Sequence, residues 1–423
     1  MTAHRTATAP RLHRVDFGTR PLADYRTTLV PGMYEEIVEL GRSLEGARVL
    51  HLSATAFGGG VAEIMYTLMP LMRDVGLRPE WGIIEGEDAF YDVTKLMHNS
   101  LQGDERSPSA AQWDIWRRYQ ELNAGLFDPN DYDVVFVHDP QPAGIARIHA
   151  DADTKWAWRC HIDLSTPNPD MLATLLPELE AYGVGFFHRS EYVPAGYGGG
   201  EAWIVPPAID PLNPKNMALS THDAQYIVRQ FGIDVDRPLM VQVSRFDPWK
   251  DPLGVVDAWR IAREQFPGLQ LALVGSLAAD DPEGMEFLEM TKRHINGDRD
   301  AVVLTNLDGV GAVEVNAFQV AADVVLQKST KEGFGLTVSE ALWKGRPMIA
   351  GNVGGIRSQI TNGVSGWLVD SVEEAAAAAI DALGNPERAA QMARTGKEHV
   401  REQFLTPRYL RDHLRSYRHL LDS

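Results

Sequence analysis

Short apolar runs alternate with amphipathic segments along the first half of the chain. Residues 47–52 form an apolar run, residues 57–60 form a glycine turn, and apolar side chains then recur at helical spacing through residue 69. Residues 110–125 repeat the helical pattern. The other strand-length runs cover residues 80–84, 132–137, 156–162 and 184–188. Strands that alternate with helices predict a parallel sheet with helices on both faces.

A second series of the same kind begins at residue 238. Its predicted strands cover residues 238–243, 269–274, 301–304, 324–327, 347–350 and 366–369. Its predicted helices cover residues 254–264, 313–321, 337–343, 375–383 and 386–404. Two successive doubly wound α/β units predict a ligand cleft near the carboxyl ends of the strands.

A proline-rich stretch at residues 203–211 separates the two series and predicts a hinge. We therefore expect a first Rossmann-like domain over residues 1–205, with a loose arm over about residues 1–15. A second Rossmann-like domain is expected over residues 206–405. The last segment, residues 406–423, is predicted to be a helix that crosses back to the first domain.

Composition narrows the class. The chain has 423 residues, 44% hydrophobic and 23% charged, which is ordinary for a globular protein of two domains. The net charge of −18 disfavours binding to nucleic acid or an anionic membrane, and no apolar run is long enough to cross a bilayer. The single cysteine, Cys160, excludes an internal disulfide and fits a cytoplasmic location. No spacing of ligands indicates a metal site.

The turn at Gly58, Gly59 and Gly60 lies where a strand passes into a helix. Glycines there let backbone N–H groups approach a phosphate or a sugar, although the turn can equally serve packing alone. The full dinucleotide fingerprint and its acidic ribose ligand are missing, which disfavours a nicotinamide enzyme.

Two cations follow the predicted strand at residues 238–243. Arg245 and Lys250 would lie at the carboxyl end of that strand, where a doubly wound fold binds its ligands. A guanidinium and an ammonium group can neutralise a diphosphate together and stabilise it as a leaving group. The alternative for such a pair in isolation is a solvated basic loop.

Two glutamates flank a glycine loop in the second domain. Glu332 precedes the loop, and Glu340 lies eight positions later on the following helix. Ionised carboxylates accept hydrogen bonds from the hydroxyls of a sugar or a ribose. The backbone of Gly335, Leu336 and Thr337 would offer N–H groups to phosphates at the helix start. Each glutamate alone could also be an ordinary helix residue.

Polar residues also end two strands of the first domain. His161 could bond a hydroxyl of a donor sugar, while Asp139 and Asp163 could orient the hydroxyls of an acceptor. A structural role for His161 is the alternative, and His51 and His188 are interpreted as structural. Trp156 and Trp158 are predicted to be core residues.

Together these motifs resemble the retaining GT-B glycosyltransferases of family four, over nearly the whole chain. The resemblance rests on the hinge, Arg245 with Lys250, Glu332 with Glu340, and the glycines at 354 and 355. The closer likeness, to the trehalose glycosyltransferring synthases of that family, lies in residues 57–64, 138–142, 159–165 and 244–250.

The resemblance implies reversible formation of trehalose from a nucleoside diphosphate glucose and glucose, with retention and without an enzyme nucleophile. Arg245 and Lys250 would bind the diphosphate, Glu332 and His161 the donor glucose, and Glu340 the ribose. Gly59, Gly60 and the loop at Asn306 would lie beside the donor. No cofactor or metal is implied, and UDP, ADP and GDP all stay open.

Two other functions are compatible with these motifs. One is a retaining trehalose phosphorylase of the same fold, which uses inorganic phosphate and releases glucose 1-phosphate. The other is a catalytically silent protein that binds sugar nucleotides. Expected partners are the nucleotide sugar, glucose and trehalose, with no nucleic acid and no membrane; the oligomeric state is open, with a homodimer among the options.

Overall fold

The computed structural model describes residues 11–57, 59–277 and 282–423, which fold into two compact units. The first unit contains the described residues up to Thr27, with Pro31–Pro206 and Pro407–Ser423. The second contains Thr28–Val30 and Pro207–Thr406. The divisions expected from the sequence, after residues 205 and 405, each lie one residue earlier.

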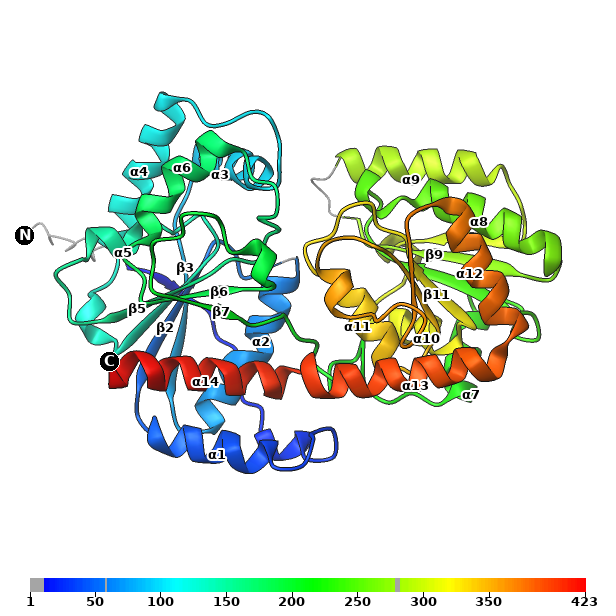
Figure 1. Cartoon of the computed structure of the whole chain (residues 1–423), viewed down its shortest axis with the longest axis horizontal. Coiled ribbons are helices and arrows are strands. Elements are labelled where there is room, and N and C mark those ends of the chain that lie inside the picture. Colours follow the sequence, from blue (N-terminus) through cyan, green and yellow to red (C-terminus); the bar gives the residue numbers. More distant parts are fainter. Residues whose placement is uncertain (1–10, 58, 278–281) are drawn as a thin grey trace, which may run out of the picture. The chain divides into compact units, whose positions relative to one another are not determined.

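A seven-stranded sheet forms the centre of the first unit, in the order β1-β3-β2-β4-β5-β6-β7 (Figure 1). Only the pair of β1 with β3 is antiparallel among these neighbours. The strands are β1 (His13–Arg14), β2 (Arg48–Ser53), β3 (Arg78–Ile83), β4 (Val134–His138), β5 (Lys155–Arg159), β6 (Val184–Phe187) and β7 (Glu201–Ile204).

Helices cover both faces of this sheet (Figure 1). On one face lie α3 (Asp88–Leu101), α4 (Ala110–Ala124), α5 (Ile145–Ile148) and α6 (Pro169–Leu179). On the other lie α1 (Met33–Ser43), α2 (Gly59–Asp74) and α14 (Thr406–Asp422). Short 3₁₀ helices are η1 (Leu22–Tyr25), η2 (Pro129–Asp131) and η3 (Ser190–Tyr192).

The alternation of side chains along the strands explains the two layers. Leu50 and Leu52 of β2 join the same hydrophobic cluster as Val135 and Val137 of β4. Because successive residues of a strand point to opposite faces, His51 points to the other face, toward α14. Its ring lies 2.8 Å from the Tyr417 hydroxyl of that helix.

The second unit contains a six-stranded parallel sheet in the order β10-β9-β8-β11-β12-β13. Its strands are β8 (Leu239–Val243), β9 (Gln270–Val274), β10 (Ala301–Leu304), β11 (Val324–Gln327), β12 (Met348–Gly351) and β13 (Trp367–Val369). The chain runs outward from β8 to β10 and then returns to place β11 on the other side of β8. This reversal makes the gap between the ends of β8 and β11 the switch point, where doubly wound sheets bind ligands.

The helices of the second unit also form two layers. One layer contains α7 (Thr221–Arg229), α10 (Ala312–Ala321), α11 (Leu336–Trp343) and α13 (Pro386–Gln403), and the other contains α8 (Pro252–Gln265), α9 (Pro282–Ile295) and α12 (Val372–Gly384). The 3₁₀ helices are η4 (Pro248–Lys250), η5 (Asn306–Asp308) and η6 (Gly354–Ser358). Val241 packs into the first layer and Met240 into the second, so β8 is buried on both faces.

Two expectations at the ends of the first unit need correction. The loose arm over about residues 1–15 is wrong for its last residues, while residues 1–10 lie outside the described part. Leu12 is buried, and β1 pairs with β3. Arg14 also donates to the Tyr132 hydroxyl at 2.8 Å and pairs with Glu80, so a strand and an ion pair hold this segment.

The predicted hinge at residues 203–211 begins too early. Trp203 and Ile204 belong to β7, which pairs with β6 at the edge of the sheet. The prolines at 206 and 207 follow this strand rather than interrupt it, because an edge strand tolerates a proline at its end.

Among the described residues, no helix combines the length and the apolar character that a membrane crossing requires.

Candidate active site

The loop after β8 is organised by Asp247. Its Oδ1 accepts hydrogen bonds from the N–H groups of Trp249 at 3.0 Å and Lys250 at 3.1 Å, which caps η4. Its Oδ2 lies 3.1 Å from Nη2 of Arg245. The Arg245 side chain is 63% exposed, so Asp247 holds one nitrogen of its guanidinium while the rest stays open to a ligand.

Lys250 and Glu332 join the two loops at the switch point. Nζ of Lys250 lies 2.5 Å from Oε2 of Glu332, and the side chains are only 15% and 12% exposed. The Ser329 hydroxyl donates to the same oxygen at 3.3 Å. The cation and the carboxylate that the sequence assigned to separate partners therefore form one charge-assisted pair.

A second pair lies beside the first. Lys328, the residue after β11, pairs with Asp251, which caps α8 by accepting from the Gly254 N–H at 3.0 Å. Lys328 is 8% exposed. The loops after β8 and β11 are thus joined by two lysine–carboxylate pairs, and the loop after β8 adds a third cation, Arg245.

The glycine loop before α11 has a fixed backbone. Gly335 has a φ of 83°, the left-handed conformation that glycine adopts without strain, and it caps α11. The Gln359 amide donates to the Phe334 carbonyl at 2.5 Å and accepts from the Ser339 hydroxyl at 2.6 Å. The first N–H groups of a helix have no partner within that helix, so Leu336 and Thr337 lie where an anion could bind.

Glu340 lies deeper, on α11, and is 1% exposed. Its Oε1 is 3.5 Å from Nζ of Lys215, while its Oε2 is buried without a hydrogen-bond partner among the described residues. Lys344 donates to the carbonyl of Glu340 at 3.3 Å, and burial lowers the pKa of Lys344 to about 8. A buried carboxylate oxygen with an unused acceptor position suits a ligand hydroxyl.

Asn306 has a structural role that the sequence did not predict. Its Oδ1 accepts from the Leu277 N–H at 2.8 Å, and its Nδ2 donates to the Leu277 carbonyl at 3.3 Å. Both polar atoms of the side chain therefore hold the loops after β9 and β10 together. Any contact with a nucleotide would come from the backbone of this loop.

Asp139 and His161 meet in the first unit, at the ends of β4 and β5. Oδ1 of Asp139 accepts from the backbone N–H of His161 at 2.8 Å. Asp139 has a φ of 66°, an uncommon conformation for a residue other than glycine. Burial raises the pKa of its carboxyl to about 7, against the opposing effects of the His161 hydrogen bond and the Arg159 charge.

The remaining candidates of the first unit lie near these two. Asp163 is 7% exposed and accepts from the Ser165 N–H at 2.8 Å, which forms a tight turn after β5. Gly59 and Gly60 open α2, while Gly58 lies outside the described residues. Trp156 and Trp158, at 6% and 0% exposure, are core residues as predicted.

Several residues of the two sites were not predicted. In the second unit, Lys328 pairs with Asp251, Gln359 fixes the glycine loop through the Phe334 carbonyl, and Lys215 lies near Glu340. In the first unit, His138 bonds His161. Lys328 had a visible signal, because it follows a buried strand as Arg245 does. The partners of Gln359 and Lys215 are far away in sequence and gave none.

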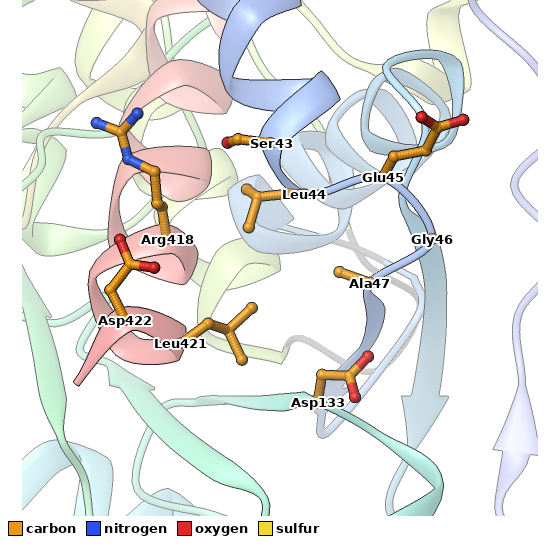
Figure 2. Close-up of a pocket in the computed structure, with 9 residues that line it drawn as sticks. All are labelled: Ser43, Leu44, Glu45, Gly46, Ala47, Asp133, Arg418, Leu421 and Asp422. Carbon is orange, nitrogen blue, oxygen red and sulfur yellow. The ribbon is translucent and has the colours of Figure 1, made fainter.

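A separate hollow lies at the opposite end of the first sheet. It has a volume of about 300 Å³ and is lined by Ala47, Asp133 and Arg418, among others (Figure 2). Ala47 and Asp133 precede β2 and β4, so the hollow is at the amino ends of parallel strands. Ligands of doubly wound folds bind at the carboxyl ends, and this hollow is therefore not the candidate site.

No group of acidic, histidine or cysteine side chains suited to a metal occurs among the described residues.

The chain matches two protein families. Residues 51–194 match "Trehalose synthase, N-terminal domain", and residues 223–399 match "Glycosyl transferases group 1". A trehalose synthase of Rubrobacter xylanophilus is 52% identical over 97% of this chain and 99% of its own length. The chain belongs to the trehalose synthase family. A trehalose synthase of Pyrococcus horikoshii is 43% identical over 94% of this chain and 96% of its own length.

More distant proteins share the architecture of this family member. A UDP-forming α,α-trehalose-phosphate synthase from Burkholderia vietnamiensis aligns with a TM-score of 0.70 at 15% identity, over 89% of this chain and 99% of its own. An Anabaena protein in complex with UDP and glucose aligns with a TM-score of 0.63 at 15% identity, over 88% and 99%. The predicted GT-B fold with two Rossmann-like units is confirmed.

A trehalose phosphorylase of Pleurotus pulmonarius is also similar, at 27% identity over 85% of this chain. The match spans only 54% of that longer protein. Family membership makes the chain a hexosyltransferase that acts on trehalose and takes sugars as substrates.

Proposed function

We propose that the chain is a retaining glycosyltransferase that reversibly forms trehalose from a nucleoside diphosphate glucose and glucose. The observation that carries the proposal is the group of cations at the switch point of the second sheet. Lys250, Lys328 and Arg245 gather there, in a chain whose net charge is −18. Three cations gathered in an acidic protein, each held in place by a carboxylate, suit a multiply charged anion such as a diphosphate.

On this proposal Arg245 and Lys250 bind the diphosphate. Arg245 is exposed and planar, and it can bond two phosphate oxygens at once. Lys250 is mostly buried and has N–H groups beyond the one that Glu332 accepts. The N–H groups of Gly335, Leu336 and Thr337 add donors at the start of α11. The proposed chemistry needs no metal, because these groups supply the positive charge.

The carboxylates bind hydroxyl groups in this account. Glu332 uses Oε2 for Lys250 and keeps Oε1 for the hydroxyls of the donor glucose. Glu340 offers its unused Oε2 to the ribose. The backbone near Asn306 contacts the base, which explains why the side chains alone do not identify it.

The first unit supplies the remaining contacts of the proposal. His161 bonds the donor glucose, and Gly59 and Gly60 bring the start of α2 close to the substrates. Asp139 has one oxygen committed to the His161 backbone and uses the other for the acceptor glucose. Asp163 likewise keeps one oxygen beyond its bond to Ser165.

The proposed reaction takes place on one face of the donor sugar. The bond between the anomeric carbon and the diphosphate oxygen breaks, and the cations stabilise the charge that develops on the diphosphate. The acceptor hydroxyl gives its proton to the departing phosphate oxygen and forms the new bond on the same face. Glu332 and Glu340 are therefore not the acid and nucleophile of a glycosidase.

The reverse direction tests this proposal. Purified protein would be incubated with trehalose and, in separate reactions, UDP, ADP, GDP or inorganic phosphate, and the glucosyl product identified by mass spectrometry. We expect a nucleoside diphosphate glucose. Glucose 1-phosphate, formed only with inorganic phosphate, would establish the phosphorylase instead. Binding of a sugar nucleotide without turnover in either direction would establish the silent binding protein.

A further inference from the structure

Five side chains form a continuous hydrogen-bonded row inside the first unit. Nε2 of His161 lies 2.9 Å from Nδ1 of His138, whose Nε2 lies 2.9 Å from Nδ1 of His51. Nε2 of His51 lies 2.8 Å from the hydroxyl of Tyr417, which lies 3.0 Å from Nδ1 of His413. We call these five residues the histidine row. It runs from the loop after β5 across the neighbouring strands β4 and β2 and ends on α14.

The rings of the row are electrically neutral. His51, His138, His413 and Tyr417 are at most 2% exposed. Burial lowers the pKa of all four histidines, to about 3 for His138, and raises that of Tyr417. The buried Arg159 guanidinium nearby lowers the pKa of three of the histidines further.

Neutrality fixes one direction for the hydrogen bonds between the histidine rings of the row. A neutral imidazole has one N–H donor and one nitrogen acceptor, so each ring that donates on one side must accept on the other. Two directions are available, toward His161 or away from it. The choice at one end of the row therefore decides the tautomer at the other end.

The end at His413 decides the direction. Its Nε2 is buried and has no hydrogen-bond partner among the described residues. If His413 accepted from Tyr417, its Nε2 would carry an unsatisfied N–H, whereas a His413 that donates to Tyr417 leaves only a lone pair there. Buried N–H groups without an acceptor are rare because they are costly. His413 therefore donates to Tyr417. The Tyr417 hydroxyl can give its own hydrogen to His51 at 2.8 Å or to Sδ of Met72 at 3.9 Å. A thioether is a weak acceptor, and a phenol is a better donor than a neutral imidazole, so Tyr417 donates to His51, His51 to His138 and His138 to His161.

We propose that the histidine row holds His161 as the tautomer that is protonated on Nδ1, and that Tyr417, His51 and His138 are positioning residues for it. Nδ1 of His161 has no partner among the described residues, so it is left for a ligand. His161 then presents a hydrogen-bond donor to a sugar hydroxyl and cannot accept a proton there. Its role in binding the donor sugar rests on the proposed function; the tautomer does not.

The test combines nitrogen NMR with steady-state kinetics. Protein labelled with ¹⁵N-histidine would show which ring nitrogen of His161 carries the hydrogen, with the signals assigned by a His161→Asn variant. The variant Tyr417→Phe removes one hydroxyl from the row. The matched control is Tyr409→Phe, which removes a buried hydroxyl from the same helix that has no hydrogen-bond partner among the described residues.

In the unmodified protein we expect Nδ1 of His161 to be protonated. Tyr417→Phe should give a mixture of tautomers and lower kcat roughly five- to tenfold with little change in KM for glucose, as the loss of one orienting hydrogen bond predicts. Tyr409→Phe should change neither the tautomer nor kcat. Thermal unfolding of both variants checks that they fold.

Protonation of Nε2 in the unmodified protein would overturn the inference, whatever the variants do. So would an unchanged His161 spectrum in a folded Tyr417→Phe protein. If the tautomer is as expected but the unmodified protein transfers no glucose, the proposed function fails and the tautomer assignment stands.

Discussion

Lys250 and Glu332 are the two charged residues on which the proposed binding of the donor depends. Each comes from a different loop, and each side chain is mostly shielded from water. In such surroundings an ion pair holds its geometry well, and removal of one partner leaves a costly unpaired charge. The positions of the two groups are therefore set before any substrate binds.

We predict that Lys250→Ala lowers kcat by about a hundredfold or more, because it removes a group that stabilises the departing diphosphate. Initial rates at saturating nucleotide sugar measure this. The control is Lys292→Ala, which removes an exposed lysine of α9 that pairs with Glu289 at 3.3 Å. Unchanged turnover of Lys250→Ala at saturating substrate would contradict the role.

The carboxyl of Asp139 predicts a pH dependence of stability. Burial raises its pKa from 3.8 to about 7, so the folded protein binds this proton more tightly than the unfolded chain. Between these values the folded state keeps the proton and the unfolded state loses it, so stability falls as pH rises. The full effect is on the order of 4 kcal/mol and is complete above about pH 7.

The variant Asp139→Asn tests this sign. Asparagine keeps an acceptor for the His161 N–H and tolerates the positive φ. We expect the variant to gain in unfolding free energy relative to the unmodified protein as pH rises from 4 to 7, in urea titrations at several pH values. A difference that is flat over this range would show that the pKa of Asp139 is not raised.

The loop before α11 depends on glycine 355 as much as on glycine 335. A Cβ at Gly355 would lie 2.4 Å from the Gly333 carbonyl oxygen and 2.6 Å from Cα of Phe334, which are backbone atoms. The loop would have to move, and with it the N–H groups at the start of the helix. We expect Gly355→Ala to cost about 1–3 kcal/mol of stability and to weaken binding of the nucleotide sugar.

The control for this variant is Gly268→Ala in the same unit. The nearest atoms to a Cβ there are 3.9 Å away, which is an ordinary contact. Calorimetric binding of a nucleoside diphosphate and thermal unfolding would be measured for both. Equal affinity of the two variants would mean that the loop before α11 does not bind the phosphates.

The sequence predicted the buried elements well and the exposed edge strands of the first sheet poorly. The strand expected at residues 324–327 is β11, and the helix expected at 337–343 begins one residue earlier as α11. Apolar periodicity is strong in such elements because both faces are buried. The strands β1 and β7 lie at the two edges of their sheet and carry mostly exposed residues, so their pattern was too weak to recognise.

The candidate site was predictable only as far as it follows from the ends of strands. Arg245, Lys250 and Glu332 could be placed because each comes shortly after a buried strand. The bond between Lys250 and Glu332, and that between His51 and Tyr417, join residues far apart in the chain. No local pattern specifies such pairs, and they emerge only when the sheet and its covering helices are assembled.

The chain has two Rossmann-like units, and each has polar residues at the carboxyl ends of its strands. On the proposed function, this local chemistry lets a chain of net charge −18 bind an anionic donor. The cations are concentrated in the second unit, and the neutral histidine row lies in the first. On the proposed function, the second unit binds the charged part of the donor, and residues of both units contact the sugars.

Formation of trehalose from labelled substrates tests the account most directly. The protein would be mixed with glucose carrying ¹³C at its anomeric carbon and with UDP-, ADP- or GDP-glucose, and the products followed by NMR. The account predicts α,α-trehalose labelled in one ring, together with the free nucleoside diphosphate. An α,β-linked product, or trehalose that forms only from glucose 1-phosphate, would contradict it.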